Sequence, residues 1–190
     1  QFLLELDEVP EEVLGRTKIV YLNYPNNPTA AVAPRGYLER VVRTCRERDI
    51  LLVYDNAYSE LAYDGYVPPS IFEIAGAREV AVEFHSLSKT YNMTGWRQGW
   101  AVGAPELVQP LAKVKSFIDT GSFMAIQAAG VAALESWAEF VPRNVAIFRE
   151  RRDAAVEAFR AAGFACDVPK AAMYLWVALP DGLPSRAFTD

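Results

Sequence analysis

Three short runs of apolar and β-branched residues alternate with helix-forming segments, and this alternation most limits the folds open to the chain. The runs are typical of strands buried in a sheet and cover residues 18–24, 50–54 and 79–85. Amphipathic helices are expected from near Pro34 and over residues 105–117, 122–137 and 142–163. Strands joined by helices favour an α/β fold, a mostly parallel sheet with helices on both faces.

Shorter signals complete the predicted order of elements. Ser70 is a good capping residue for a short helix that Gly76 ends, and Ser122 is expected to cap the helix that follows it. Pro142 is expected to open the last long helix, because proline suits the first helical turn. Two more strands are predicted, over residues 98–102 and 173–179.

Polar residues follow each of the three buried runs at the point where the run ends. They are Asn27 in an Asn-Pro turn, Asp55, and the group of Ser86, Ser88 and Lys89. In a parallel sheet the carboxyl ends of the strands share one edge, and ligands collect there. The sequence therefore predicts a single site at this edge.

The group after the third run has the chemistry needed to hold a phosphate beside a reactive amine. Hydroxyls and a planar guanidinium match phosphate oxygens, which suits Ser86, Ser88 and Arg97 to an anion. An amine that lies next to cations and away from water loses its proton more easily. Lys89 would then be a nucleophile toward carbonyl carbon. The alternative interpretation is a solvated turn that contains a chance lysine and arginine.

Asp55 and Asn27 also admit structural interpretations. A carboxylate at a buried strand end is costly unless it meets a cation or several donors. Asp55 would otherwise cap a helix, with Tyr58 packing nearby, and Asn27 would belong to an ordinary turn. The presence of all three groups at strand ends favours one shared ligand.

The lysine segment resembles that of the fold-type I pyridoxal-phosphate enzymes, in particular the class I/II aminotransferases. Their pattern is Ser-x-Ser-Lys followed by Gly-x-Arg-x-Gly, and it is complete here in Ser86, Ser88, Lys89, Gly95, Arg97 and Gly99. Residues 89–97 are most similar to those of LL-diaminopimelate-, aspartate- and alanine-type members.

Two upstream segments match the same family. Asp55 and Tyr58 fill its Asp-x-Ala-Tyr pattern, and Asn27 lies in its Asn-Pro-Thr-Gly turn. The usual glycine of that turn is Ala30 here. A positive φ would cost alanine about 1 kcal/mol or more, and the position is expected to tolerate a methyl group.

The resemblance implies pyridoxal-phosphate-dependent transamination between an L-amino acid and a 2-oxo acid. By this resemblance pyridoxal 5'-phosphate is held as a Schiff base on Lys89, which also moves the substrate α-proton. Asp55 would pair with the pyridine nitrogen, and Tyr58 with Asn27 would hydrogen-bond the phenolic oxygen of the ring. The phosphate would be held by Ser86, Ser88 and Arg97. The implied catalytic residues are thus Lys89, Asp55 and Tyr58.

The resemblance also implies an organisation for the chain. Residues 1–137 would belong to the large cofactor domain, and residues 138–190 would begin a smaller α+β carboxy-terminal domain. The chain starts at Gln1 without a methionine and stops at Asp190 without a closing element, so a longer parent protein is expected. The family implies a homodimer that works in amino acid metabolism and biosynthesis.

Composition narrows the function classes. A net charge of −5 argues against a nucleic-acid partner, and no apolar run reaches the ~20 residues needed to cross a membrane. Cys45 and Cys166 lack metal-ligand spacing, and the single histidine, His85, excludes a multi-histidine metal site, so no metal is expected. The default compartment is the cytoplasm.

Other functions of related folds stay open from the sequence. A relative of the same fold could carry out C–S β-elimination or decarboxylation, and products would separate these from transamination. A regulator with an aminotransferase-like domain would carry a helix-turn-helix elsewhere in its gene. A truncated, inactive remnant is the last alternative, against which the complete cofactor motifs argue.

Overall fold

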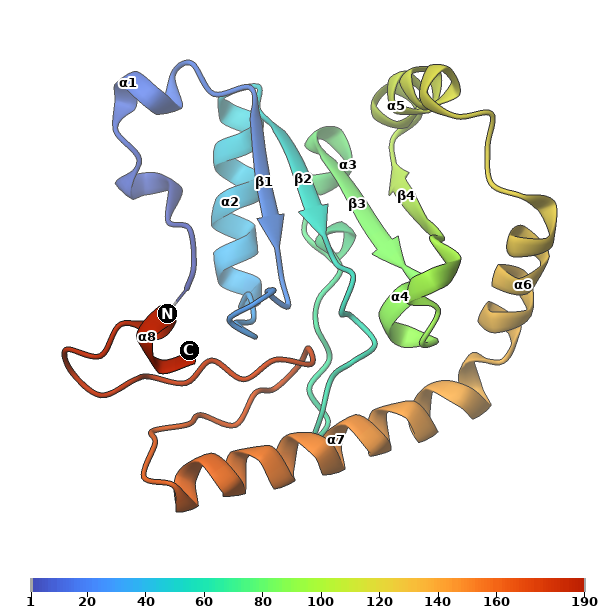
Figure 1. Cartoon of the computed structure of the whole chain (residues 1–190). Helices are drawn as coiled ribbons and strands as arrows, with labels where there is room; N and C mark the ends of the chain where they lie inside the picture. The colour runs from blue at the N-terminus through green and yellow to red at the C-terminus, as the bar shows by residue number, and fades with distance from the viewer. Residues whose placement is uncertain (1, 190) are drawn as a thin grey trace.

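The computed structural model describes residues 2–189 and contains one four-stranded sheet (Figure 1). Its strands lie in chain order and are β1 (Ile19–Asn23), β2 (Leu51–Asp55), β3 (Ala81–Ser86) and β4 (Gly99–Gly103). The first three run parallel, whereas β4 pairs antiparallel with β3. The predicted mostly parallel α/β sheet is confirmed, and these four strands begin and end within two residues of the predicted bounds.

Helices connect and flank the strands. The α-helices are α1 (Glu11–Leu14), α2 (Arg35–Glu47), α3 (Ala77–Val80), α4 (Leu87–Thr90), α5 (Pro105–Ile118), α6 (Met124–Glu135), α7 (Trp137–Ala161) and α8 (Ser185–Thr189). Three 3-10 turns are η1 (Leu6–Glu8), η2 (Ile71–Glu73) and η3 (Thr94–Trp96). Among residues 2–189 no helix is both long and apolar enough to cross a membrane.

The core lies between α2 and one face of the sheet. The predicted apolar stripe of α2 is buried in full and consists of Tyr37, Leu38, Val41, Val42 and Cys45. It packs on alternate side chains of β1 and β2, since residues two apart on a strand share a face. The opposite face of β1 is open within the described residues, and Tyr21 is 62% exposed there.

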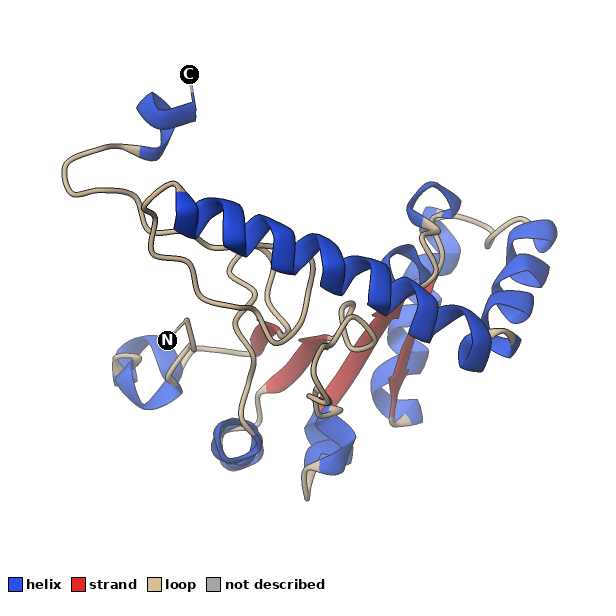
Figure 2. Cartoon of the chain, turned by 90° about the horizontal axis from the view of Figure 1, so that it is seen from below, coloured by secondary structure: helices blue, strands red, loops and turns tan. Residues whose placement is uncertain are grey.

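Helix α7 lies on the other side of the sheet from α2 and crosses the carboxyl ends of β1, β2 and β3 (Figures 1 and 2). Val141 packs on Leu87 and Tyr91 of the lysine segment, and Val145 adds to the same cluster. A helix from the carboxy-terminal part of the chain therefore forms one wall beside the predicted site.

The helix starts expected at Ser122 and Pro142 are wrong. Phe123 precedes α6 and no side chain caps that helix, while α7 begins five residues before Pro142. Proline lacks the N–H that bonds four residues back, so Pro142 costs α7 one hydrogen bond. Burial of Val141 against α4 offsets that loss and keeps the extra turn helical.

The strand expected over residues 173–179 does not form in the described chain. A strand needs a partner for its backbone groups, and here only a single bridge joins Val177 to Cys166. Residues 79–80 are helical rather than extended. Ser70 caps η2, as expected, but Gly76, with a φ of 82°, precedes α3 instead of ending a helix.

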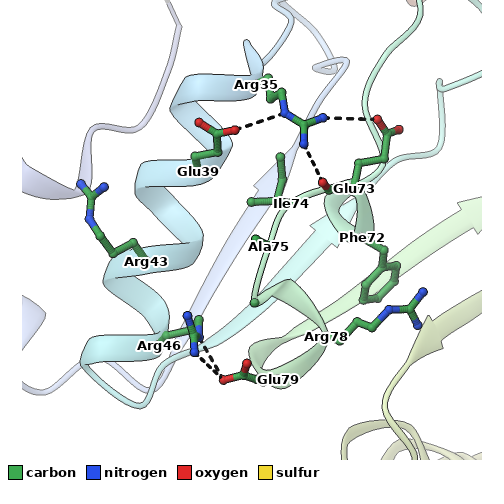
Figure 3. Close-up of a pocket in the computed structure, with 11 residues that line it drawn as sticks. Arg35, Glu39, Arg43, Arg46, Phe72, Glu73, Ile74, Ala75, Arg78 and Glu79 are labelled. Carbon is green, nitrogen blue, oxygen red and sulfur yellow. Dashed lines mark hydrogen bonds and ion pairs between the residues drawn. The ribbon is translucent and has the colours of Figure 1, made fainter.

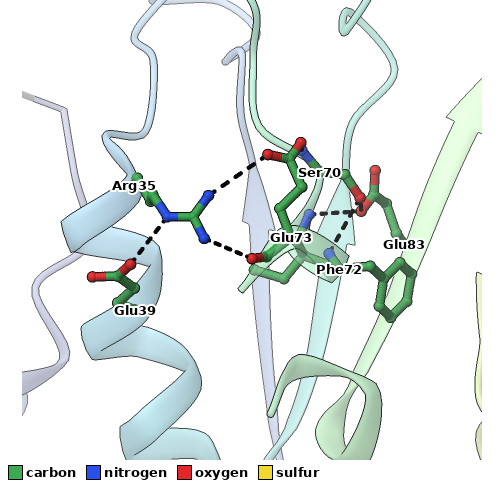
Figure 4. A network of polar contacts seen from close by, with 7 residues as sticks. Arg35, Glu39, Ser70, Phe72, Glu73 and Glu83 are labelled. Atoms are coloured by element: carbon green, nitrogen blue, oxygen red, sulfur yellow. Dashed lines mark hydrogen bonds and ion pairs between the residues drawn. The ribbon is translucent and has the colours of Figure 1, made fainter. Parts of the chain in front are cut away.

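Glu83 on β3 is fully buried and holds together three parts of the fold (Figure 4). Its carboxylate accepts hydrogen bonds from Asn56 Nδ2 at 2.8 Å, Ser70 Oγ at 2.7 Å and Ile71 N at 2.8 Å. His85 Nε2 lies 3.0 Å from Glu83 Oε1, the oxygen that also accepts from Asn56. Burial alone would raise the pKa of Glu83, but the hydrogen bonds from His85, Asn56 and Ser70 outweigh it and lower the pKa.

The Glu83→Ala variant is expected to lose about 3–5 kcal/mol of unfolding free energy at neutral pH, because it leaves buried donors unpaired. Since the folded-state pKa of Glu83 is lowered, its contribution is present at neutral pH and disappears as the pH falls through that pKa. Urea unfolding at several pH values measures both effects. Glu79→Ala, which removes an exposed partner of Arg46, is the matched control and should cost about 1 kcal/mol or less. Equal losses in the two variants would contradict the assignment.

Candidate functional site

The sheet register brings the three predicted motifs to one edge. Asn23 is paired with Asp55 and Asp55 with Phe84, so the loops that follow β1, β2 and β3 start side by side (Figure 1). Two hydrogen bonds join them, from Asn23 Nδ2 to Asp55 O at 3.0 Å and from Asn56 N to Phe84 O at 2.9 Å. The predicted common edge is therefore observed.

Asn27 and Tyr58 meet although 31 residues separate them. Asn27 Nδ2 lies 3.4 Å from the Tyr58 hydroxyl, and Asn23 Oδ1 accepts a hydrogen bond from Asn27 N at 2.8 Å. Tyr58 is only 4% exposed, and burial, followed by its contact with Tyr174, raises its pKa. The phenol thus keeps its proton and is a donor at neutral pH.

Ala30 ends the same turn with a φ of 56°, so the turn does require the left-handed conformation. An alanine there costs about 1 kcal/mol relative to glycine. The backbone of the turn is nevertheless closed by a hydrogen bond from Ala30 N to Asn26 O at 2.9 Å. The methyl group is accommodated, as expected, but at the energetic cost that the positive φ entails.

Asp55 is half-buried at the end of β2. Burial raises the pKa of its carboxyl, while the Ala57 backbone N–H and nearby His85 act in the opposite direction. No lysine, arginine or histidine within residues 2–189 forms an ion pair with it. A partly desolvated carboxylate of this kind favours a cationic ligand group at the edge.

Ser86, Ser88 and Lys89 lie at the junction of β3 and α4. The Ser86 hydroxyl caps α4 by accepting a hydrogen bond from Ser88 N at 3.1 Å, and Ser88 is buried. Lys89 follows one residue later and is partly buried. The cap fixes the backbone direction from which the Lys89 side chain leaves the helix.

Asn144 of α7 holds this turn from the other side, and the sequence did not reveal it. Its amide nitrogen donates to Thr90 O at 3.0 Å and lies 3.4 Å from Lys89 O, and its oxygen accepts from Asn92 Nδ2 at 2.9 Å. The residue is 4% exposed. The only signal in the sequence that could have identified Asn144 is its place beside the apolar positions of a long helix.

Arg97 is not in hydrogen-bond contact with the two serines. It has a φ of 54°, is exposed, and donates from Nη1 to Thr94 O at 2.9 Å. Thr94 Oγ1 in turn donates to Ser88 O at 3.1 Å. The arginine is therefore linked to the serine turn through Thr94, and its side chain is exposed.

His85 lines a small cavity of about 100 Å³ next to Asn56 and Ser86. Its ring stacks on Trp100 of β4, with centroids 5.1 Å apart and planes inclined by 13°. Together with its contact to Glu83, this stacking gives His85 a structural role at the strand–loop junction.

A second contact that the sequence did not reveal joins Tyr58 to Tyr174. The two hydroxyl oxygens are 2.5 Å apart, and the rings meet edge-on with centroids 5.5 Å apart. Residues 116 positions apart in the chain make this contact, so no local pattern predicts it.

The structure also contains a groove of about 710 Å³ between α2 and the segment of η2 and α3 (Figure 3). Its arginines pair with neighbouring glutamates, as Arg35 does with Glu39 at 3.1 Å and Arg46 with Glu79 at 2.9 Å. None of the predicted site residues lines it. The chemistry of the strand-end residues, rather than the size of a hollow, therefore locates the candidate site.

The sequences of several aminotransferases align with nearly all of this chain. An LL-diaminopimelate aminotransferase of Nitratidesulfovibrio vulgaris (strain Hildenborough) is 48% identical over 188 residues, which are 98% of this chain and 48% of that protein. LL-diaminopimelate aminotransferase 2 of Trichormus variabilis is 47% identical over 189 residues, 100% of this chain and 48% of that protein. The chain thus spans about half the length of these relatives.

Solved structures of aminotransferases have the same fold. A probable N-succinyldiaminopimelate aminotransferase from Thermus thermophilus matches with a TM-score of 0.89 and 40% identity over 95% of this chain and 49% of that one. An aminotransferase from Staphylococcus aureus matches with a TM-score of 0.90 and 33% identity over 98% of this chain and 49% of that one. The family described as aminotransferase class I and II matches residues 1–185. With the lysine, aspartate and asparagine motifs at one sheet edge, these matches show that the chain belongs to the class I/II aminotransferase family.

Proposed function

We propose that the protein carrying this chain catalyses transamination between an L-amino acid and a 2-oxo acid with pyridoxal 5'-phosphate, the cofactor of this family. The observation that carries the proposal is the half-buried carboxylate of Asp55, which has no cationic partner among the described residues and lies at the same edge as the lysine turn. Such a group fits a protonated pyridine nitrogen. The names of the relatives make LL-diaminopimelate the first amino donor to test.

The residues of this edge fit the remaining parts of the cofactor. Ser86 and Ser88 offer hydroxyl donors, and Arg97 a guanidinium, for the phosphate. Asn27 and Tyr58 present an amide and a neutral phenol that suit the phenolic oxygen. When bound, pyridoxal phosphate supplies an electron sink for the bond broken at the substrate α-carbon.

Lys89 has two tasks in this proposal. Its Nζ would hold the cofactor aldehyde and, as a free amine, would take the proton from the substrate α-carbon. The single histidine of the chain is engaged with Glu83 and Trp100, which leaves the lysine as the base. Asn144 and the Ser86 cap hold the backbone on either side of Lys89 and so orient that amine.

We extend the proposal to the organisation of the protein. Residues 1–137 form part of the large cofactor domain, residues 138–190 begin the small carboxy-terminal domain, and the protein works in the cytoplasm as a homodimer. The names of the relatives do not favour β-elimination, decarboxylation or a regulatory role. Sedimentation of the holoenzyme tests the homodimer.

Borohydride reduction of the holoenzyme, followed by peptide mass mapping, tests the cofactor assignment. A phosphopyridoxyl group is expected on Lys89 alone. The other lysines of the chain are internal controls and are Lys18, Lys113, Lys115 and Lys170. An unmodified Lys89, or label spread evenly over the controls, would refute the proposal.

A further inference from the structure

The contact between Tyr58 and Tyr174 bears directly on how the candidate site presents its phenol. Tyr58 is 4% exposed and its hydroxyl has two neighbours, Asn27 Nδ2 at 3.4 Å and the Tyr174 hydroxyl at 2.5 Å. Either tyrosine can donate the hydrogen bond between them. The choice between the two directions decides what Tyr58 offers to a ligand.

The number of donors and acceptors around the Tyr58 hydroxyl distinguishes the two directions of its hydrogen bond with Tyr174. A phenol oxygen has one hydrogen and two acceptor positions. The amide nitrogen of Asn27 can only donate, so it occupies one acceptor position of Tyr58. If Tyr58 donated to Tyr174, only a lone pair of Tyr58 would face the anionic phenolic oxygen of bound pyridoxal phosphate. If Tyr174 donates instead, both acceptor positions of Tyr58 are filled and its hydrogen is left for the ligand.

Tyr174 is free to be the donor. Its hydroxyl has no other hydrogen-bond partner among residues 2–189. We propose that Tyr174 is a positioning residue whose hydroxyl donates to Tyr58 and leaves the hydrogen of Tyr58 directed at the phenolic oxygen of bound pyridoxal phosphate. This inference rests on the proposed function.

The backbone that carries Tyr174 is held in place by the segment that follows Tyr58. Ala172 N donates to Leu61 O at 2.8 Å, and Tyr63 N donates to Lys170 O at 2.9 Å. The Tyr63 hydroxyl also donates to Ala172 O at 2.6 Å. The two tyrosines therefore belong to one connected unit, which a positioning role requires.

The test compares two ligands that differ by one atom. Binding of pyridoxal phosphate and of its analogue lacking the phenolic oxygen, 3-deoxypyridoxal phosphate, is measured on the full-length protein freed of cofactor. For Tyr174→Phe we expect affinity for pyridoxal phosphate to fall about tenfold, the equivalent of one hydrogen bond, with affinity for the analogue unchanged. Tyr58→Phe should show the same pattern.

Tyr63→Phe is the matched control, because it removes a hydroxyl that holds the same segment without touching Tyr58. It should lower affinity for both ligands equally or not at all. Equal losses for both ligands in Tyr174→Phe would overturn the inference, since the hydroxyl would then act through packing only. Unchanged affinities in Tyr174→Phe would overturn it as well. A wild-type protein that takes up neither ligand would instead refute the proposed function on which the inference stands.

Discussion

Replacing Lys89 with alanine is expected to lower kcat of the holoenzyme by at least about 10⁴-fold, the largest effect of any single substitution in this chain. In the proposed function the side chain supplies both the amine that anchors the cofactor and the base that moves the α-proton, so one change would remove two functions. No other lysine lies in the β3–α4 turn, and the histidine nearby is bound to Glu83.

Steady-state transamination with several amino donors measures the loss. Lys113→Ala, on the exposed surface of α5, is the matched control and should leave kcat unchanged. Because only the amine is missing, added small primary amines should restore part of the activity of Lys89→Ala in proportion to their concentration. A variant that retains more than about one-hundredth of wild-type kcat would contradict the assignment of Lys89 as the base.

Substituting Asp55 with asparagine is expected to lower kcat about 10³-fold. Asparagine keeps the size of the side chain but removes the charge that, in the proposed function, pairs with the pyridine nitrogen. Loss of one partner from a buried pair costs about 3–5 kcal/mol. Asp55→Glu keeps the charge and should retain more activity than Asp55→Asn. Asp49→Asn, just before the start of β2, is the surface control.

The same substitution should have the opposite effect on the cofactor-free protein. Because burial raises the folded-state pKa of Asp55, the folded protein holds this proton more tightly than the unfolded chain does. Its ionised form therefore opposes folding at neutral pH. This cost shrinks as the pH falls through the raised pKa and is gone below the pKa of the unfolded chain. Asp55→Asn should raise the thermal midpoint at pH 7 relative to wild type, with a smaller difference at low pH. A lower midpoint at pH 7 would indicate that Asp55 has a structural role.

The sequence alone identified the sheet and the residues at its carboxyl edge. Each buried strand is a short apolar run, and a polar residue at its end stands out because burying it is costly. Asp55, Lys89 and Asn27 could therefore be identified as site residues from the order of residues along the chain. The apolar stripe of α2 could be predicted in the same way, because the helical period of 3.6 residues places Leu38 and Cys45 on one face.

Elements that depend on distant partners were predicted poorly. The run over 173–179 has the composition of a strand, yet no neighbouring edge in the described chain completes its hydrogen bonds. Pro142 has the character of a first-turn residue, yet the packing of Val141 on α4 extends the helix ahead of it. In both cases tertiary contacts outweighed local preference.

The groups that lie at the edge could be predicted from neighbouring residues, because strand ends and the spacing of the motifs are local properties of the chain. How those groups are held depends on contacts that the fold creates. Asn144 reaches the backbone of Lys89 across 55 positions and Tyr174 reaches Tyr58 across 116. The physical reason is that hydrogen-bond direction and desolvation depend on which side chains meet in space, and chain order alone does not specify those meetings.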